Sequence, residues 1–233
     1  MNPRNALNGG WFTDRNPPRL VDISVLFCLL FSTSVIEGVS PVKTTKWLFI
    51  SLICLSILIP VSAFAFYKPI RVMMPEFFGI NCQSSSLCVE DESQLARAAA
   101  LVEDSKRHLS QNWGLSVGEP RFVFCSSEQC KQTFGLSKAA GLNVGTLGIV
   151  ITPRGWSDHY VAHELIHYWQ ADNFGSLSLI FSESWVTEGM AYALSNDPRK
   201  ELHEPFESYR KQFQEWHKLH LGVPLKEAIK EVI

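Results

Sequence analysis

Apolar residues are concentrated near the start of the chain, where the segment 47–67 contains no charged side chain. A helix of this length is long enough to cross the roughly 30 Å of hydrocarbon in a bilayer. Trp47 and Tyr67 stand at its two ends, the positions that interfacial aromatic residues prefer. A shorter apolar run, 23–36, contains Ser and Thr residues and falls short of a full crossing. The pattern therefore predicts one or two hydrophobic membrane helices before residue 68.

These apolar segments have more than one interpretation. The segment 47–67 is either a transmembrane anchor or a signal segment, because its end, 61–65, has the A-x-A pattern of a cleavage site. The run 23–36 is either a second span or an interfacial helix. We therefore divide the chain into an N-terminal arm (1–46), an anchor or signal segment, and a folded domain (68–233).

From residue 68 onward the hydrophobic pattern switches between strand and helix periodicity. Short apolar runs predict two strands, at 120–125 and 146–151. Apolar positions at helical spacing, or runs compatible with a helix, predict helices at 90–113, 160–169, 185–194 and 204–221. The last segment, 225–233, is either a short helix or a loose end. This content predicts an α+β domain with a small antiparallel or mixed sheet.

The strand predicted at 146–151 comes shortly before the helix predicted at 160–169. We expect this strand to form the edge of the sheet, where its free backbone groups would pair with an extended peptide. The alternative is an internal strand with neighbours on both sides.

Four of the six cysteines fall into two closely spaced pairs. Cys82 with Cys88, and Cys125 with Cys130, are expected to form disulfides that each close a short loop. A structural zinc site made by all four thiolates is the alternative, although the C-x2-C spacing of such sites is absent. Because disulfides persist in oxidising compartments, we expect the domain to face the periplasm or the cell exterior.

The charge of the chain excludes one class of partner. It carries 21 basic and 23 acidic residues, for a net charge of −2. Nothing in this balance suggests binding to nucleic acid. The membrane is the partner that the apolar segments indicate.

The helix predicted at 160–169 contains the pattern H-E-x-x-H, and no Gly or Pro interrupts it. His163 and His167 are four residues apart, so their imidazoles project from one face of a helix and can reach one metal ion. Glu164 lies beside that face, close enough to accept a proton from a metal-bound water. Two nitrogen ligands and a neighbouring carboxylate are typical of a zinc hydrolase.

The helix predicted at 185–194 offers a third ligand. Glu188 follows His167 by 21 positions, enough chain for one helix to end and for a neighbouring antiparallel helix to present the carboxylate. Three protein ligands and one water form the usual catalytic zinc site.

The two motifs, H-E-L-I-H-Y-W and W-V-T-E-G-M-A, resemble those of the gluzincin metallopeptidases, especially the aminopeptidase-like branch with its W-x-x-E-G-x-A signature. The resemblance covers about residues 145–195. It implies a zincin-like fold in which His163, His167 and Glu188 bind Zn²⁺ and Glu164 acts as the general base. The G-x-M-E-N motif of the aminopeptidases is absent upstream of the helix.

Several further side chains are candidates for supporting roles. Tyr192 lies one helical turn after Glu188 and could stabilise an oxyanion, with Tyr160 as its rival. Asp172 and Glu183 are candidates for orienting a ligating histidine, and Arg199 and His203 for donating to the transition state. The alternative is that these are solvated polar residues.

The sequence thus predicts a membrane-anchored or exported zinc peptidase that hydrolyses peptides or proteins with a metal-activated water. The alternative is a membrane-tethered binding or assembly module whose zinc is structural. A structural site is closed by a fourth protein ligand, whereas a catalytic site leaves that position to water.

Overall fold

The computed structural model describes the backbone of residues 41–233 and the side chains of 48–59, 62 and 67–233. The chain separates into two units at Pro60–Val61. The predictions made for residues 1–40, including the apolar run 23–36, lie outside the described residues.

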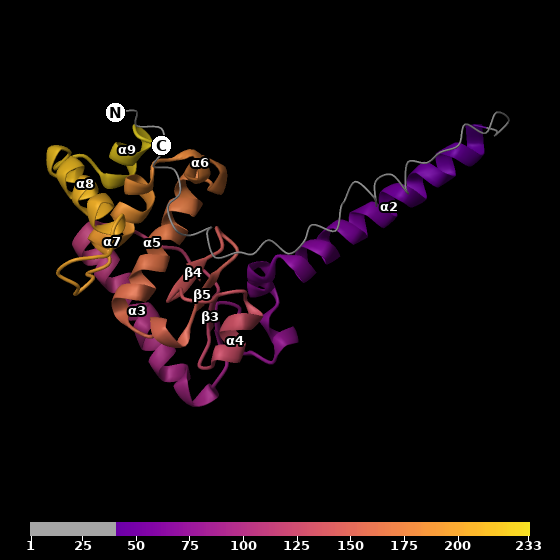
Figure 1. The fold of residues 1–233 in the computed structure, drawn as a ribbon, viewed down its shortest axis with the longest axis horizontal. Helices are drawn as coiled ribbons and strands as arrows, with labels where there is room; N and C mark the ends of the chain where they lie inside the picture. Colours follow the sequence, from indigo (N-terminus) through magenta and orange to yellow (C-terminus); the bar gives the residue numbers. More distant parts are fainter. Residues whose placement is uncertain (1–40) are drawn as a thin grey trace. The chain divides into compact units, whose positions relative to one another are not determined.

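Helix α2 (Pro41–Phe66) covers nearly all of the segment predicted to anchor the chain (Figure 1). Its described side chains from Leu48 to Ile59 are all exposed. Judged on the described residues, none of the helices is both long and apolar enough to cross a membrane. The anchor and the cleaved signal both stay predictions.

A five-stranded mixed sheet forms the centre of the unit that follows, in agreement with the predicted α+β fold. Its strands lie in the order β1 (Asn81–Cys82), β2 (Leu87–Val89), β3 (Phe122–Phe124), β5 (Ile149–Ile151) and β4 (Gly141–Asn143). The three central strands β2, β3 and β5 are parallel, while β1 and β4 run antiparallel to their neighbours. The sheet is mixed because short connections add an antiparallel strand at each edge.

The strand predicted at 146–151 is not the edge of the sheet, so that expectation was wrong. It forms β5, which pairs with β3 on one side and with β4 on the other. All three residues of β5 are apolar and fully buried, as expected for an interior strand. The edge is β4, whose residues 141–143 carry too weak a strand pattern to be recognised in the sequence.

Helices and short helical turns make up most of the remaining chain. They are η2 (Lys68–Met73), η3 (Pro75–Phe78), η4 (Glu92–Gln94), α3 (Leu95–Trp113), α4 (Glu128–Thr133), η5 (Pro153–Gly155), α5 (Asp158–Phe174), α6 (Ser176–Phe181), η6 (Trp185–Gly189), α7 (Met190–Leu194), α8 (Phe206–Leu219) and α9 (Leu225–Lys230). The predicted helices are present with shifted ends, and the one at 185–194 is divided into a π-helical turn, η6, and α7.

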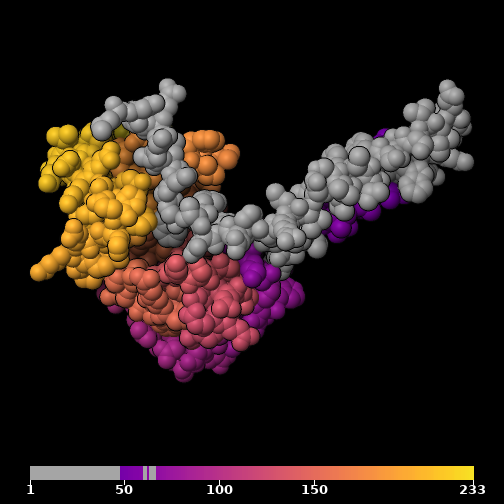
Figure 2. Space-filling model, viewed as in Figure 1, coloured from indigo at the N-terminus to yellow at the C-terminus, as the bar shows by residue number. Residues whose placement is uncertain are grey.

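Alternating side chains of the sheet bury two clusters, one on each face. Phe122, Phe124 and Ile151 belong to the larger cluster, which α3, α5, α7 and α8 cover. Val123 and Val150 point to the opposite face and join the smaller cluster, which includes α4. In the space-filling view, the residues after about 175 gather on one side of this unit and the strand-bearing residues on the other (Figure 2). Helix α5 contacts both groups, because it packs against β4 and β5 as well as against α7.

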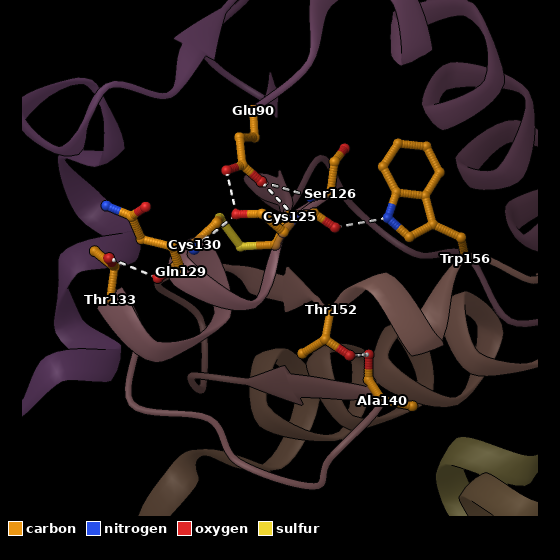
Figure 3. Close-up of a disulfide and its surroundings, with 10 residues drawn as sticks. Glu90, Cys125, Ser126, Gln129, Cys130, Thr133, Ala140, Thr152 and Trp156 are labelled. Carbon is orange, nitrogen blue, oxygen red and sulfur yellow. Dashed lines mark hydrogen bonds between the residues drawn. A yellow bond between two sulfur atoms is a disulfide. The ribbon is translucent and has the colours of Figure 1, made fainter.

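Both predicted disulfides are present, which confirms the pairing Cys82–Cys88 and Cys125–Cys130. The second joins the end of β3 to α4, and the indole nitrogen of Trp156 donates to the carbonyl of Cys125 (Figure 3). Trp156 stands just before α5, so this contact ties the start of α5 to the sheet.

A second set of hydrogen bonds holds the edge strand in place. Thr152 donates through its backbone nitrogen and its hydroxyl to the carbonyl of Ala140, which precedes β4 (Figure 3). Gly155 packs so closely on the same carbonyl that a side chain there would overlap it. The position of β4 is therefore fixed relative to the residues that lead into α5.

Candidate metal centre

Two imidazoles from consecutive turns of α5 form one side of the candidate site. His163 and His167 project from the same face, as their spacing predicted, and their Nε2 atoms lie 3.1 Å apart. His163 is buried, with 5% of its surface exposed. Each of the two facing nitrogens can present a lone pair. Two lone pairs that face each other are better suited to binding one cation than to a hydrogen bond between the two rings.

Glu188 completes the site from the π-helical turn η6. Its Oε2 lies 3.5 Å from Nε2 of His163, and its Oε1 lies 3.5 Å from Nε2 of His167. The three side chains predicted as metal ligands are thus brought together from two different elements. π-Helical turns often occur at functional sites. The sequence pattern did not predict the π-helical turn at η6.

The spacing of the three groups fits a tetrahedral metal ion. Two ligands bonded at about 2.0–2.1 Å to a tetrahedral ion lie roughly 3.3 Å apart. The observed separations are 3.1 Å between the two Nε2 atoms and 3.5 Å from each Nε2 to one oxygen of Glu188. Oε2 of Glu188 is buried and has no hydrogen-bond partner among the described residues. A buried carboxylate oxygen without a partner costs free energy, and a cation at this point would satisfy it.

The electrostatics of the group also favour a cation. Burial disfavours the charge of Glu188, but the imidazoles of His167 and His163 more than offset this and lower the pKa of the carboxyl. Burial likewise disfavours protonation of His167, yet the carboxylate of Glu188 outweighs it and raises the pKa of His167 to about 9. In the metal-free protein, His167 is therefore protonated at neutral pH, and its positive charge balances the carboxylate of Glu188.

Glu164 lies between the three candidate ligands and the edge strand β4. The residue is only 5% exposed, and burial raises the pKa of its carboxyl although His163 and His167 oppose this. The backbone of Asn143 in β4 acts on the carboxylate in the opposite direction and lowers its pKa. Gly141 leaves room for it, because a Cβ there would lie 2.7 Å from Cγ of Glu164. The predicted general base is therefore positioned from the sheet edge.

Gln170 holds His167 in place, a role that the sequence reasoning gave to other residues. Its Oε1 lies 3.0 Å from Nδ1 of His167, and its Nε2 donates to the carbonyls of Val186 and Thr187. The carboxamide thus connects a ligand on α5 to the segment that carries Glu188. Its place one turn after His167, on the same helical face, was the signal available in the sequence.

The residues predicted to orient a ligand lie elsewhere. Asp172 and Glu183 are exposed, and Glu183 accepts a hydrogen bond from the indole of Trp185. His203 is exposed too. None of these three belongs to the metal-site group in the described part of the chain.

Tyr192 packs directly on a candidate ligand, since its ring centroid lies 4.4 Å from that of His163. Burial, reinforced by the charge of Glu188, raises the pKa of Tyr192, so its hydroxyl remains a hydrogen-bond donor. The guanidinium of Arg199 stands over the rings of both Tyr192 and Tyr160. The structure therefore brings both predicted tyrosines near the centre, with Tyr192 in direct contact.

Other features of the domain do not compete with this centre. Glu76, Cys82 and Cys88 also lie close together, but both sulfurs are used in a disulfide, which leaves one carboxylate. Two hollows of about 310 and 350 Å³ are lined by none of the metal-site residues. The first lies beside Arg97 and Trp156, and the second lies between Trp113 and α8.

Comparisons of the chain with protein-family models, with curated proteins and with solved structures gave no match. The chemistry of the three ligands and Glu164 is therefore the basis for assigning a function.

Proposed function

We propose that the protein is a zinc-dependent peptidase whose Zn²⁺ is held by His163, His167 and Glu188. The observation that carries the proposal is the convergence of two Nε2 atoms, 3.1 Å apart, with a carboxylate whose two oxygens each lie 3.5 Å from one of them, next to the buried carboxyl of Glu164. Two nitrogens and one oxygen are a ligand set of catalytic zinc enzymes. The likeness of the two motifs to those of gluzincins supports the same assignment.

Glu164 is the proposed general base. When bound, zinc lowers the pKa of a water and polarises the substrate carbonyl. Glu164 takes the proton of that water and later donates it to the leaving amine. Its burial supports this role, because a raised pKa brings the carboxyl closer to the pH at which a base can both accept and release a proton. Tyr192 is the proposed donor to the oxyanion, since it packs on His163.

The edge strand β4 is the proposed docking site for the peptide backbone. Leu142 pairs with Val150 within the sheet, and the flanking residues 140 and 144 bond to the β5 side. In an antiparallel pair the backbone groups alternate, so those of Gly141 and Asn143 face away from β5. The effect of the Asn143 backbone on the pKa of Glu164 agrees with this orientation. An extended substrate would pair with the remaining groups and present its scissile bond beside Glu164.

The ligand count favours an enzyme over the alternative of a structural zinc site. A structural site is closed by four protein ligands. Among the described residues, the group that includes His163 contains three side chains of suitable chemistry. The position left over is where a catalytic site binds water.

The two disulfides support placing the domain in an oxidising compartment, outside the cytoplasm. We propose that the segment 47–67 anchors it there or exports it. Peptides or proteins in that compartment are the proposed substrates.

The test uses the full chain, purified in detergent, loaded with zinc and incubated with a peptide library. The unsubstituted protein should cleave library members, whereas Glu164→Gln should keep its zinc and lose cleavage by a factor of at least about 100. Glu183→Gln is the matched control, because Glu183 is an exposed glutamate outside the centre. Equal cleavage by Glu164→Gln and the unsubstituted protein would contradict the proposal.

A further inference from the structure

The guanidinium of Arg199 lies next to the metal centre and has no role in the proposed reaction. Arg199 follows the end of α7, and its Nε donates to Oδ1 of Asp197 at 2.8 Å. Its Nη2 donates to Oδ2 of the same carboxylate, and its backbone nitrogen donates to Oδ1 at 3.0 Å. The Asp197 side chain is 2% exposed, so the guanidinium is held by a buried anchor.

The same guanidinium also lies over two aromatic rings. Its central carbon lies 5.6 Å from the ring centroid of Tyr160 and 5.7 Å from that of Tyr192. Tyr192 in turn contacts His163. If Arg199 only stabilised the loop after α7, its bonds to Asp197 would be sufficient. Such a role does not explain why the guanidinium also lies beside Tyr192, which contacts a metal ligand.

Part of the guanidinium stays available for a ligand. Asp197 occupies Nε and one edge of Nη2, while Nη1 has no hydrogen-bond acceptor among the described residues. The Arg199 side chain is 38% exposed. A guanidinium has five N–H donors in a planar fork that matches a carboxylate.

We propose that Arg199 binds a carboxylate of the peptide substrate close to the scissile bond. The proposal rests on the proposed function, and it names the substrate class as peptides that carry a free C-terminal carboxylate or an acidic side chain. The central carbon of Arg199 lies 5.7 Å from the ring centroid of Tyr192, which lies 4.4 Å from that of His163. The distance from the guanidinium to the His163 ring is therefore no longer than about three residues of extended chain, at roughly 3.4 Å per residue. Charge-assisted bonds to carboxylates are among the strongest that a protein makes.

The experiment measures binding without cleavage. The full-length Glu164→Gln protein, loaded with zinc, is titrated into a fluorescein-labelled hexapeptide of alanine and leucine. Four forms of the peptide are compared: a free C-terminal carboxylate, a C-terminal amide, and the amide with one central residue changed to glutamate or to glutamine. The titrations are repeated after zinc is removed by chelation, because a carboxylate can also bind the metal directly.

Adding Arg199→Gln should weaken binding of at least one carboxylate peptide by about tenfold to hundredfold and change the neutral peptides less than twofold. The form that loses affinity identifies the source, a chain terminus or an acidic side chain. Arg97→Gln is the matched control, since Arg97 also stands over an aromatic ring, that of Trp156, and should change nothing. A carboxylate preference that Arg199→Gln leaves intact, or the lack of any preference before the substitution, would overturn the proposal.

Two further measurements separate this result from other failures. Zinc content and thermal unfolding show whether Arg199→Gln is folded; if it is not, Arg199→Lys keeps the charge, loses the planar fork and should show a smaller loss of carboxylate affinity. Because the readout is binding, a protein that cleaves no peptide but loses carboxylate affinity on substitution would refute the proposed function and leave the role of Arg199 standing.

Discussion

Oε1 of Gln170 lies 3.0 Å from Nδ1 of His167, one turn further along the same helix. Since both hydrogens of the carboxamide nitrogen are donated to the carbonyls of Val186 and Thr187, its oxygen is fixed as an acceptor. In the neutral ring of His167, the single proton is then held on Nδ1, and Nε2 has the lone pair that a metal needs.

Replacing Gln170 should weaken metal binding. Gln170→Met keeps a similar volume but removes the acceptor, so His167 is no longer held in the metal-binding tautomer. We expect zinc affinity to fall about 10- to 100-fold, measured by competition with a chelating dye. Asn173→Ala is a suitable control, because Asn173 lies on the same helix and donates only to the carbonyl of Trp169. Unchanged zinc affinity in Gln170→Met would show that Gln170 does not orient His167.

Removing the carboxylate of Glu188 should remove the metal. Glu188→Ala leaves two neutral nitrogen ligands and no charge to balance the cation, so the dialysed protein should contain little zinc by atomic absorption. Glu183→Ala, five residues earlier and exposed, should retain a full equivalent. If Glu188→Ala also retained a full equivalent, the third ligand would have to be a different residue.

The metal-free protein should lose stability as the pH rises from about 6.5 to 9. The pKa of His167 is raised from 6.5 to about 9, chiefly by Glu188 acting against burial, so its contribution is complete below 6.5 and lost as the pH passes 9. The pKa of Glu188 is lowered from 4.5, so its contribution is complete above 4.5 and lost as the pH falls through the lowered value. The pair is thus fully effective only between about 4.5 and 6.5.

Glu188→Gln removes this pH dependence while keeping the shape of the side chain. Unfolding of the chelated proteins by denaturant, followed from pH 6 to pH 9.5, should show a loss on the order of 1–3 kcal/mol in the unsubstituted protein relative to the variant. Parallel curves for the two proteins would contradict the His167–Glu188 coupling.

Gly189 should not tolerate a side chain. It packs against α8 so closely that a Cβ would overlap the backbone carbonyl of Tyr209 and lie 3.2 Å from Cβ of Phe213. Gly189→Ala should therefore lower the free energy of unfolding by about 1–3 kcal/mol. Gly118→Ala is the control, since the nearest atom to a Cβ there lies at 3.8 Å in the Tyr168 side chain. Equal stability of the two variants would mean that α8 shifts to accommodate the new Cβ without a loss in the free energy of unfolding.

Local geometry alone determined part of the site and of the fold. His163 and His167 converge because four residues make about one helical turn, whatever surrounds the helix. The disulfide partners are equally local, at separations of six and five residues. In both cases the chain between the partners is so short that the sequence spacing fixes their distance.

Long-range packing decided the rest. Glu188 reaches the imidazoles only because α6 turns the chain back and Gly189 lets η6 pack against α8. Whether β4 or β5 forms the edge of the sheet depends on which strands pair. The sequence of a short apolar strand does not show which strands will lie beside it. Arg199 comes to lie beside Tyr192 through the loop that Asp197 closes. Spacing along the chain predicts contacts within a helical turn or a tight loop, whereas contacts between elements require the tertiary structure.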